Sequence, residues 1–366
     1  MKKTKFYSLK KILEKDCVYN IIFGERSNGK TYAVLKYAIE NYVQTGGQLA
    51  YVRRWKEDVT GRRASEVFSA LINNDEVYTI TKGEYSSIYY FSGKYYLCNY
   101  DEHTKKPIYN DEDCIGYTFS LSDMEHNKSV SYPKITTVMF DEFLTKYVYL
   151  NDEFMLFMNT LSTIIRQRTN VKIFMLGNTV NKYCPYFKEM GLTNIQNMSQ
   201  GDIDVYTYGD SKLKVAVEYC KPSQKSKASN FYFSFGNPSL HMITSGSWDL
   251  GIFPHLPIKY KPKDIQFTYF ILFNDRTYQC EIIDINDMWF TYIHEKTTEL
   301  QNPDKDLIYT LEYIPKINYN RNVLKPISKL QERIAWFYKT DRVYFQNNDV
   351  GNAITNYLKL CGGAVK

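Results

Sequence analysis

The sequence lacks the patterns that mark disulfide-bonded, zinc-binding and membrane-spanning proteins. Its seven cysteines are scattered, odd in number and contain no C-x-x-C pair, and its five histidines form no H-E-x-x-H pattern. This usage is typical of reduced thiols in a cytosolic protein and argues against a disulfide framework or a zinc site. No stretch approaches about 18 consecutive apolar residues, and charged side chains from Lys10 onward interrupt any signal-peptide pattern. We therefore expect a soluble intracellular protein without a membrane partner.

Length and charge allow several kinds of partner. The 366-residue chain is long enough for two or three domains and carries a formal charge of +6. This mild basic excess permits a nucleic-acid partner without requiring one. The 34 tyrosines and 21 phenylalanines must serve mostly in packing, and exposed members suit base stacking or subunit contacts.

Residues 24–31 match the phosphate-binding loop pattern G-x-x-x-x-G-K-[ST] in full. An apolar, β-branched run at 18–23 predicts a buried strand before the loop. Residues 32–43 predict a helix after it, which ends at Gly46 and Gly47. Because the pattern requires this context, we expect the chain to bind ATP and Mg²⁺. The expected nucleotide-binding residues are Gly24, Glu25, Arg26, Ser27, Asn28, Gly29, Lys30 and Thr31.

These residues have separate tasks in phosphate binding. Gly24 and Gly29 allow backbone angles that turn successive N–H groups toward the phosphates. The helix that begins near Lys30 adds the positive end of its dipole. Lys30 is expected to reach the β- and γ-phosphates, and the Thr31 hydroxyl is expected to ligate Mg²⁺.

A second motif occupies residues 135–142, where an apolar, β-branched run ends in Asp141 and Glu142. This is the Walker B arrangement, in which the strand brings Asp141 to the magnesium ion. Glu142 is then placed to orient or deprotonate the attacking water. The alternative is an acidic pair at the end of a surface strand, and the P-loop upstream favours the catalytic interpretation.

Two further candidates flank the strand expected at 171–176. Asn178 follows its carboxyl end, where ligands bind in parallel sheets, so it is expected to sense the γ-phosphate, with a polar turn residue as the alternative. Arg166 precedes the strand, whose six residues span roughly 20 Å. It is therefore expected far from its own nucleotide, in a position to act on that of a neighbour as an arginine finger.

Alternating strands and helices predict an α/β fold over residues 1–200, namely a P-loop NTPase of the ASCE type with a parallel sheet flanked by helices. The tyrosine-rich stretch at 77–119, with a hairpin turn at Ser92-Gly93, predicts an insertion within this domain. We expect residues 201–260 to form a linker or lid. Residues 261–366 predict a smaller α+β domain with strands near 267–273, 277–283 and 288–293, followed by a helix.

Two basic regions are candidates for contact with DNA. Arg53, Arg54 and Lys56 follow a predicted strand at 48–52, and an ordinary solvated loop is the alternative. Residues 321–366 contain eight basic and three acidic side chains, which suits contact with a phosphate backbone. A solubilising surface is the alternative for this second region.

With these motifs in view, most of the chain resembles the encapsidation ATPases of small protein-primed tailed phages. The similarity is strongest from residue 128 onward, whereas the insertion at 77–119 is longer than expected and the tail matches only loosely. The residues that carry it are Phe6-Tyr7, the P-loop with Arg26, Tyr51-Val52-Arg53-Arg54, Lys128 with Tyr132-Pro133, Phe140-Asp141-Glu142-Phe143, Arg166-Gln167-Arg168, and Asn178 with Pro185-Tyr186-Phe187.

The resemblance implies a homomeric, pentameric ring that couples ATP hydrolysis to translocation of double-stranded DNA into a prohead. It also implies an RNase H-like C-terminal domain, commonly without nuclease activity, and work with the portal and a prohead RNA in the host cytoplasm. By the same match, Lys128 and Arg166 would act in trans, and Lys56 would lie near the DNA channel.

Two other classes of enzyme remain as alternatives. A terminase or helicase with a live nuclease would need a metal site, for which Asp284, Asp287 and Asp349 are candidates. A P-loop kinase shares residues 24–31 but gives no reason for Glu142 or for a basic tail. DNA-stimulated ATPase activity without a phosphorylated product would separate the motor from the kinase.

Overall fold

The computed structural model describes residues 7–123, 130–145, 149–150, 152–178, 184–221, 253–256 and 258–361, without the side chain of residue 196. The chain divides into two compact units, which cover mainly residues 1–248 and 249–366. Lys128 lies outside the described residues, as do residues 222–252 of the predicted linker.

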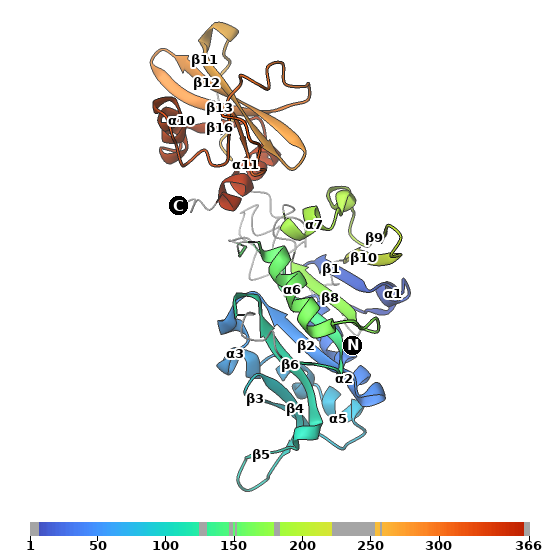
Figure 1. Ribbon diagram of the computed structural model, residues 1–366. Helices are drawn as coiled ribbons and strands as arrows, with labels where there is room; N and C mark the ends of the chain where they lie inside the picture. The colour runs from blue at the N-terminus through green and yellow to red at the C-terminus, as the bar shows by residue number, and fades with distance from the viewer. Residues whose placement is uncertain are drawn as a thin grey trace. The chain divides into compact units, whose positions relative to one another are not determined.

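A single large sheet organises the N-terminal unit (Figure 1). Its strand order is β3-β4-β6-β2-β7-β8-β1-β10-β9, with β5 paired to β4. The strands are β1 (Tyr19–Gly24), β2 (Gln48–Arg53), β3 (Ser87–Phe91), β4 (Lys94–Tyr100), β5 (Pro107–Ile108), β6 (Cys114–Ser120), β7 (Ile135–Asp141), β8 (Lys172–Asn178), β9 (Ile203–Tyr208) and β10 (Leu213–Tyr219).

The predicted parallel sheet is confirmed for the six central strands, from β6 to β10. The edges differ, because β4 runs antiparallel to β6, β3 to β4, and β9 to β10. The tyrosine-rich stretch, predicted as an insertion within this domain, therefore adds strands to the edge of its central sheet. Its predicted hairpin turn is confirmed, since Ser92 and Gly93 have φ of 49° and 80°, as a two-residue turn of right-twisted strands requires.

Helices cover both faces of this sheet (Figure 1). Neighbouring residues on a strand point to opposite faces. Met139 belongs to the core beneath α2 with Val34 and Ile39, whereas the ring of Phe140 lies 4.9 Å from that of Phe157 on α6. The helices of this unit are α1 (Lys10–Leu13), α2 (Lys30–Thr45), α3 (Gly61–Ser65), α4 (Ser69–Asn73), α5 (Glu76–Ile80), α6 (Glu153–Ile165) and α7 (Pro185–Glu189).

The predicted boundary at residue 200 is wrong. Strand β10 pairs in parallel with β1, with Tyr19 opposite Val215, and β9 completes that edge of the sheet. Residues 203–219 therefore belong to the N-terminal unit. The C-terminal unit also begins before residue 261, because His255 forms a bridge with Phe345.

A second sheet, of order β15-β14-β11-β12-β13-β16, forms the C-terminal unit. The three predicted strands are confirmed as an antiparallel meander, β11 to β13. The predicted helix is α10, whose Ile334 and Phe337 are buried. The elements are β11 (Ile265–Phe273), β12 (Arg276–Ile285), β13 (Met288–Lys296), β14 (Ile308–Thr310), β15 (Tyr319–Asn320), α10 (Lys329–Lys339), β16 (Val343–Phe345) and α11 (Asn348–Leu360).

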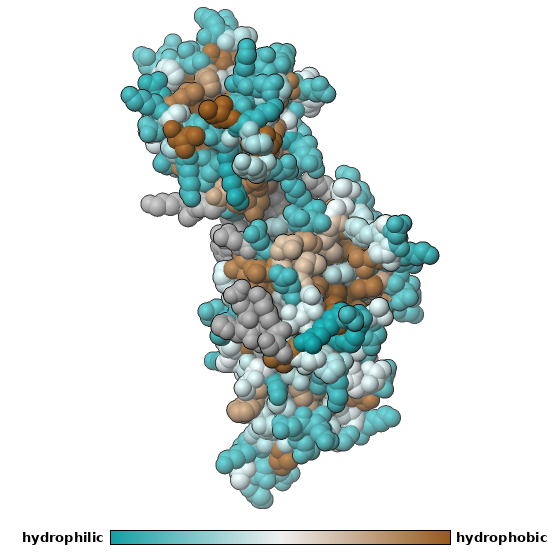
Figure 2. Space-filling model, viewed as in Figure 1, coloured by the Kyte–Doolittle hydropathy of each residue, from teal (hydrophilic) through white to brown (hydrophobic). Residues whose placement is uncertain are grey.

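Hydropathy varies over the surface of the described residues and among their helices. Hydrophilic residues predominate on the face of each unit that Figure 2 shows, with smaller apolar areas between them. Among the helices whose residues are described, none is long and apolar enough to span a bilayer.

Candidate active site

The carboxyl ends of three neighbouring strands bring the sequence motifs together. Gly24 at the end of β1 lies opposite Asn178 of β8, and Asp141 of β7 lies opposite Leu176 of β8. A pocket of about 740 Å³ opens there, lined by the P-loop from Arg26 to Thr31 and by Asp141, Glu142 and Asn178. The sheet register therefore gathers the predicted nucleotide site in one place.

The P-loop has the backbone that the pattern predicts. Gly29 caps α2 with a left-handed φ of 95°, which a side chain would strain. A Cβ on Gly24 would lie 2.9 Å from the Cβ of Cys220, so only glycine fits this close approach. Helix α2 ends at Gly46, also left-handed, whose N–H bonds to the carbonyl of Tyr42.

Lys30 is buried and held inside the loop. Its ammonium donates to the carbonyl of Glu25 at 2.7 Å, to Asn28 Oδ1 at 3.2 Å and to Asn178 Oδ1 at 3.4 Å. Burial lowers the pKa of Lys30, and the neighbouring Asp141 carboxylate opposes that shift. The three hydrogen bonds thus fix the Lys30 side chain at the base of the pocket, where phosphate binding requires a basic group.

Thr31 and Asp141 form an oxygen-rich corner beside Lys30. The Thr31 hydroxyl lies 3.4 Å from both carboxylate oxygens of Asp141. Burial raises the pKa of Asp141 to about 6, although the Arg53 guanidinium lowers it. A hydroxyl and a buried carboxylate are oxygen donors of the kind that Mg²⁺ prefers, so this corner fits the metal of a magnesium nucleotide.

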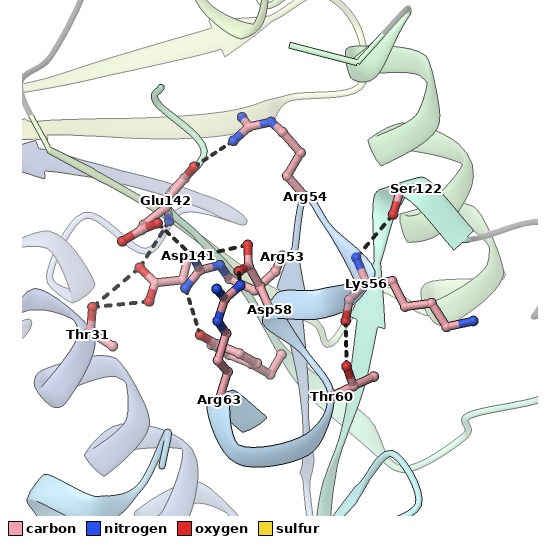
Figure 3. A network of polar contacts seen from close by, with 11 residues as sticks. Thr31, Arg53, Arg54, Lys56, Asp58, Thr60, Arg63, Ser122, Asp141 and Glu142 are labelled. Atoms are coloured by element: carbon pink, nitrogen blue, oxygen red, sulfur yellow. Dashed lines mark hydrogen bonds and ion pairs between the residues drawn. The ribbon is translucent and has the colours of Figure 1, made fainter. Parts of the chain in front are cut away.

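Glu142 lies at the mouth of the pocket, where Arg53 binds its side chain (Figure 3). The carboxylate is about half exposed and lies 2.7 Å from Arg53 Nη2. Arg53 also bonds to the Tyr51 hydroxyl at 3.3 Å and to Asp58 at 3.5 Å. Arg53 thus contacts the predicted catalytic base, and its predicted contact with DNA stays a prediction.

The predicted contact of Arg54 with DNA is wrong, because this side chain is buried. Arg54 is 6% exposed and binds Glu153 through two bonds of 2.7 and 2.8 Å. No local pattern in the sequence indicates the partners of the two arginines, because these depend on the order of the strands in the sheet. Parallel strands β2 and β7 are neighbours, so residues that follow β2 must meet residues that follow β7.

Lys56 remains as the exposed member of the predicted cluster. Its side chain is 59% exposed and lies 2.7 Å from Asp123. Arg62 and Arg63 on the neighbouring α3 are more exposed still, at 91% and 69%. Each of these basic side chains lies beside an acidic one, Asp123, Glu66 and Asp58 respectively, and contact of Lys56 with DNA stays a prediction.

Arg166 lies far from its own pocket, as its position before β8 predicts. It follows the last residue of α6 and donates to the carbonyl of Val130 at 3.0 Å. Strand β8 separates it from Asn178 by roughly 20 Å. Arg166 has φ of 51° and ψ of −129°, a conformation costly for a side chain, so the surrounding structure must hold it there.

One supporting contact was missed by the sequence interpretation. Tyr7 donates its backbone N–H to the carbonyl of Asn28 at 3.0 Å and its hydroxyl to Glu218 at 2.6 Å. The segment before α1 thus braces the P-loop against β10. The partners are 211 residues apart, so local patterns contain no signal for the pairing.

The proposed acidic cluster of the C-terminal unit is not formed. Asp349 binds Arg276, at the start of β12, at 2.7 Å, whereas Asp284 lies eight residues along that strand, roughly 26 Å away. Asp287 lies in the turn beyond it. Two-metal sites hold their ions about 4 Å apart, so these carboxylates do not share one. No group of three metal-binding side chains occurs anywhere in the described residues.

Comparison with known proteins agrees with this arrangement. The model of the family described as podovirus DNA encapsidation protein (Gp16) matches residues 1–95 and 86–312. The chain is 25% identical over 307 residues to the DNA packaging proteins of Bacillus phage PZA and Bacillus phage phi29. Each alignment covers 82% of this chain and 82% of the relative.

Solved structures show the same fold. The chain matches the bacteriophage Phi-29 viral genome packaging motor assembly with a TM-score of 0.57, at 22% identity over 97% of this chain and 99% of that chain. It matches the Phi-28 gp11 DNA packaging motor with a TM-score of 0.56, at 16% identity over 98% of both chains. Since the family model extends over most of the sequence, this chain belongs to the podovirus DNA encapsidation protein (Gp16) family.

Proposed function

We propose that this protein is the ATP-driven motor that moves double-stranded DNA into a phage prohead. The observation that carries the proposal is the pocket in which Lys30, Asp141 and Glu142 converge, in a chain of a DNA encapsidation family. Curated relatives that share 82% of its length are described as DNA packaging proteins.

The chemistry assigned to the pocket follows from its contacts. Lys30 neutralises the β- and γ-phosphates, and Thr31 and Asp141 supply oxygens to Mg²⁺. Bound Mg²⁺ supplies further charge neutralisation as the phosphoryl group transfers. Glu142 accepts the proton of the attacking water once its ion pair with Arg53 opens, and Asn178 senses the γ-phosphate.

Ring assembly explains the position of Arg166. Roughly 20 Å of strand separates this arginine from its own nucleotide site, a distance that supports action on the nucleotide of an adjacent subunit. Lys128 has the same proposed role by family resemblance. In the proposed arrangement, five copies of this chain form a ring around the DNA, bound to the portal and the prohead RNA in the host cytoplasm.

Strand order supports the finer fold assignments. Strand β8 lies between the P-loop strand β1 and the Walker B strand β7, which supports the assignment to an ASCE-type core. In the C-terminal unit, an antiparallel meander is extended by β14 and β15, each parallel to its neighbour, which supports an RNase H-like relationship. The separation of Asp349 from Asp284 argues against a live nuclease there.

The test is ATP turnover with and without duplex DNA, with analysis of where the γ-phosphate goes. A motor is expected to release inorganic phosphate and to turn over faster with DNA. Transfer of the phosphate to another molecule would favour the P-loop kinase. Turnover that is indifferent to DNA would contradict coupling to translocation.

A further inference from the structure

Arg54 links three parts of the N-terminal unit, namely the end of β2, the turn that follows β7 and the start of α6. From the end of β2, its guanidinium donates to the carbonyl of Glu142 at 3.2 Å and to the carbonyl of Phe143 at 2.7 Å. The same group makes a two-bond ion pair with Glu153, the first residue of α6. Arg54, which the sequence assigned to DNA contact, thus connects the turn that follows the Walker B strand to β2 and α6 through hydrogen bonds.

The buried Glu153 carboxylate has further hydrogen-bond donors besides Arg54. Its carboxylate, 2% exposed, also accepts from the Tyr186 hydroxyl at 2.9 Å and from the backbone N–H of Leu150 at 2.8 Å. A buried ion pair is stable only when such additional hydrogen bonds complete it. The pair therefore fixes the guanidinium in a single orientation, with its remaining N–H groups directed at the turn.

The turn itself needs external support. Glu142 has a left-handed φ of 58°, which side-chain-bearing residues adopt only when neighbouring contacts hold them. Its N–H bonds to Asp141 Oδ1 at 3.1 Å, and the N–H of Phe143 bonds to the carbonyl of Leu176. Arg54 binds the carbonyl side of the same two residues, so the backbone that carries the Glu142 carboxylate is held from both sides.

We propose that Arg54, oriented by Glu153, is a positioning residue that holds the Glu142 turn in the geometry needed for water activation. Arg54 is not among the residues that line the pocket, and the hydrogen bonds described above direct its guanidinium to the turn and to Glu153. Its effect therefore falls on the hydrolytic step and not on nucleotide affinity. The inference rests on the proposed function, because it takes Glu142 as the base.

The test compares Arg54→Lys with wild type and with two reference variants. Lysine retains the charge opposite Glu153, but one ammonium cannot bind both carboxylate oxygens and both carbonyls as the planar guanidinium does. Tyr95→Phe is the matched control, since it removes a buried 3.0 Å bond to the carbonyl of Ala64, away from the turn. Glu142→Gln reports the loss of the base itself.

Each variant is assayed for kcat, nucleotide Kd and Tm, at a temperature well below the lowest Tm. Arg54→Lys is expected to bind nucleotide within threefold of wild type and to lose about 10- to 100-fold in kcat, as misplaced catalytic groups do. Tyr95→Phe is expected to lower Tm while kcat stays within threefold. If Arg54→Lys does not fold, Glu153→Gln loosens the arginine without removing it and is expected to shift kcat in the same direction.

A kcat of folded Arg54→Lys within threefold of wild type would overturn the inference. An equal loss of kcat in Tyr95→Phe would overturn it too, because lowered stability would then explain both. Failure of the proposed function has a different signature. In that case wild type itself shows no turnover, or Glu142→Gln is as active as wild type.

Discussion

Replacement of Asp141 by asparagine separates the catalytic value of this carboxylate from its cost to the folded protein. Burial raises the pKa of Asp141 from 3.8 to about 6. At 1.36 kcal/mol per pKa unit, the ionised carboxylate costs the folded state about 3 kcal/mol, to order of magnitude. Asp141→Asn is thus expected to abolish turnover yet to unfold with a higher free energy than wild type at pH 8.

The stability difference between Asp141→Asn and wild type should depend on pH. Because the folded pKa lies above the unfolded one, the folded state binds the proton more tightly. The destabilisation of the folded wild-type protein by ionised Asp141 therefore begins as the pH rises above about 4 and reaches its full size above about 6. In denaturant unfolding without nucleotide, the free energy of unfolding of Asp141→Asn should exceed that of wild type by about 3 kcal/mol at pH 8 and by roughly half of that at pH 5. An advantage that does not change with pH, or a destabilised variant, would refute the reasoning.

Three further outcomes follow from the same geometry. Removal of Mg²⁺ from the nucleotide complex should lower Tm more at pH 8 than at pH 5, because the buried, ionised Asp141 then lacks the charge of the metal; an equal loss of Tm at both pH values would speak against metal binding at Asp141. Binding to duplex DNA should weaken about a thousandfold or more between about 50 and 200 mM salt if the exposed basic loop and tail contact at least six phosphates, and a flat dependence would exclude such contacts. Arg166→Ala should lose ATP hydrolysis. Part of the activity should return when it is mixed with Glu142→Gln, because subunits of that variant supply an intact arginine to the competent site of an Arg166→Ala neighbour. A mixture that exchanges subunits and stays inactive would make Arg166 a cis or structural residue.

The sequence predicted those parts of the site whose signals are local. The P-loop, the strand before it and the helix after it lie within some 30 residues, and the structure confirms all three. Gly46 and the Ser92-Gly93 turn were likewise predictable, because their left-handed backbones restrict which residues fit.

The parts that could not be predicted depend on long-range pairing. Arg53 and Arg54 look like a surface cluster in the sequence, but their carboxylate partners are 89 and 99 residues away. The boundary at residue 200 was wrong for the same reason. Strand β10 has the alternation of an ordinary edge hairpin, and only its parallel register with β1 assigns it to the N-terminal unit.

The central claim is that ATP is hydrolysed at the pocket formed by Lys30, Asp141 and Glu142, with Glu142 as the base. Its most direct test is single-turnover hydrolysis by Glu142→Gln in the presence of Mg²⁺ and duplex DNA, alongside a measurement of nucleotide affinity. The amide retains the shape of the side chain but cannot accept the proton, so binding should stay close to wild type while hydrolysis slows about 100-fold or more. Hydrolysis within threefold of the wild-type rate would contradict the claim.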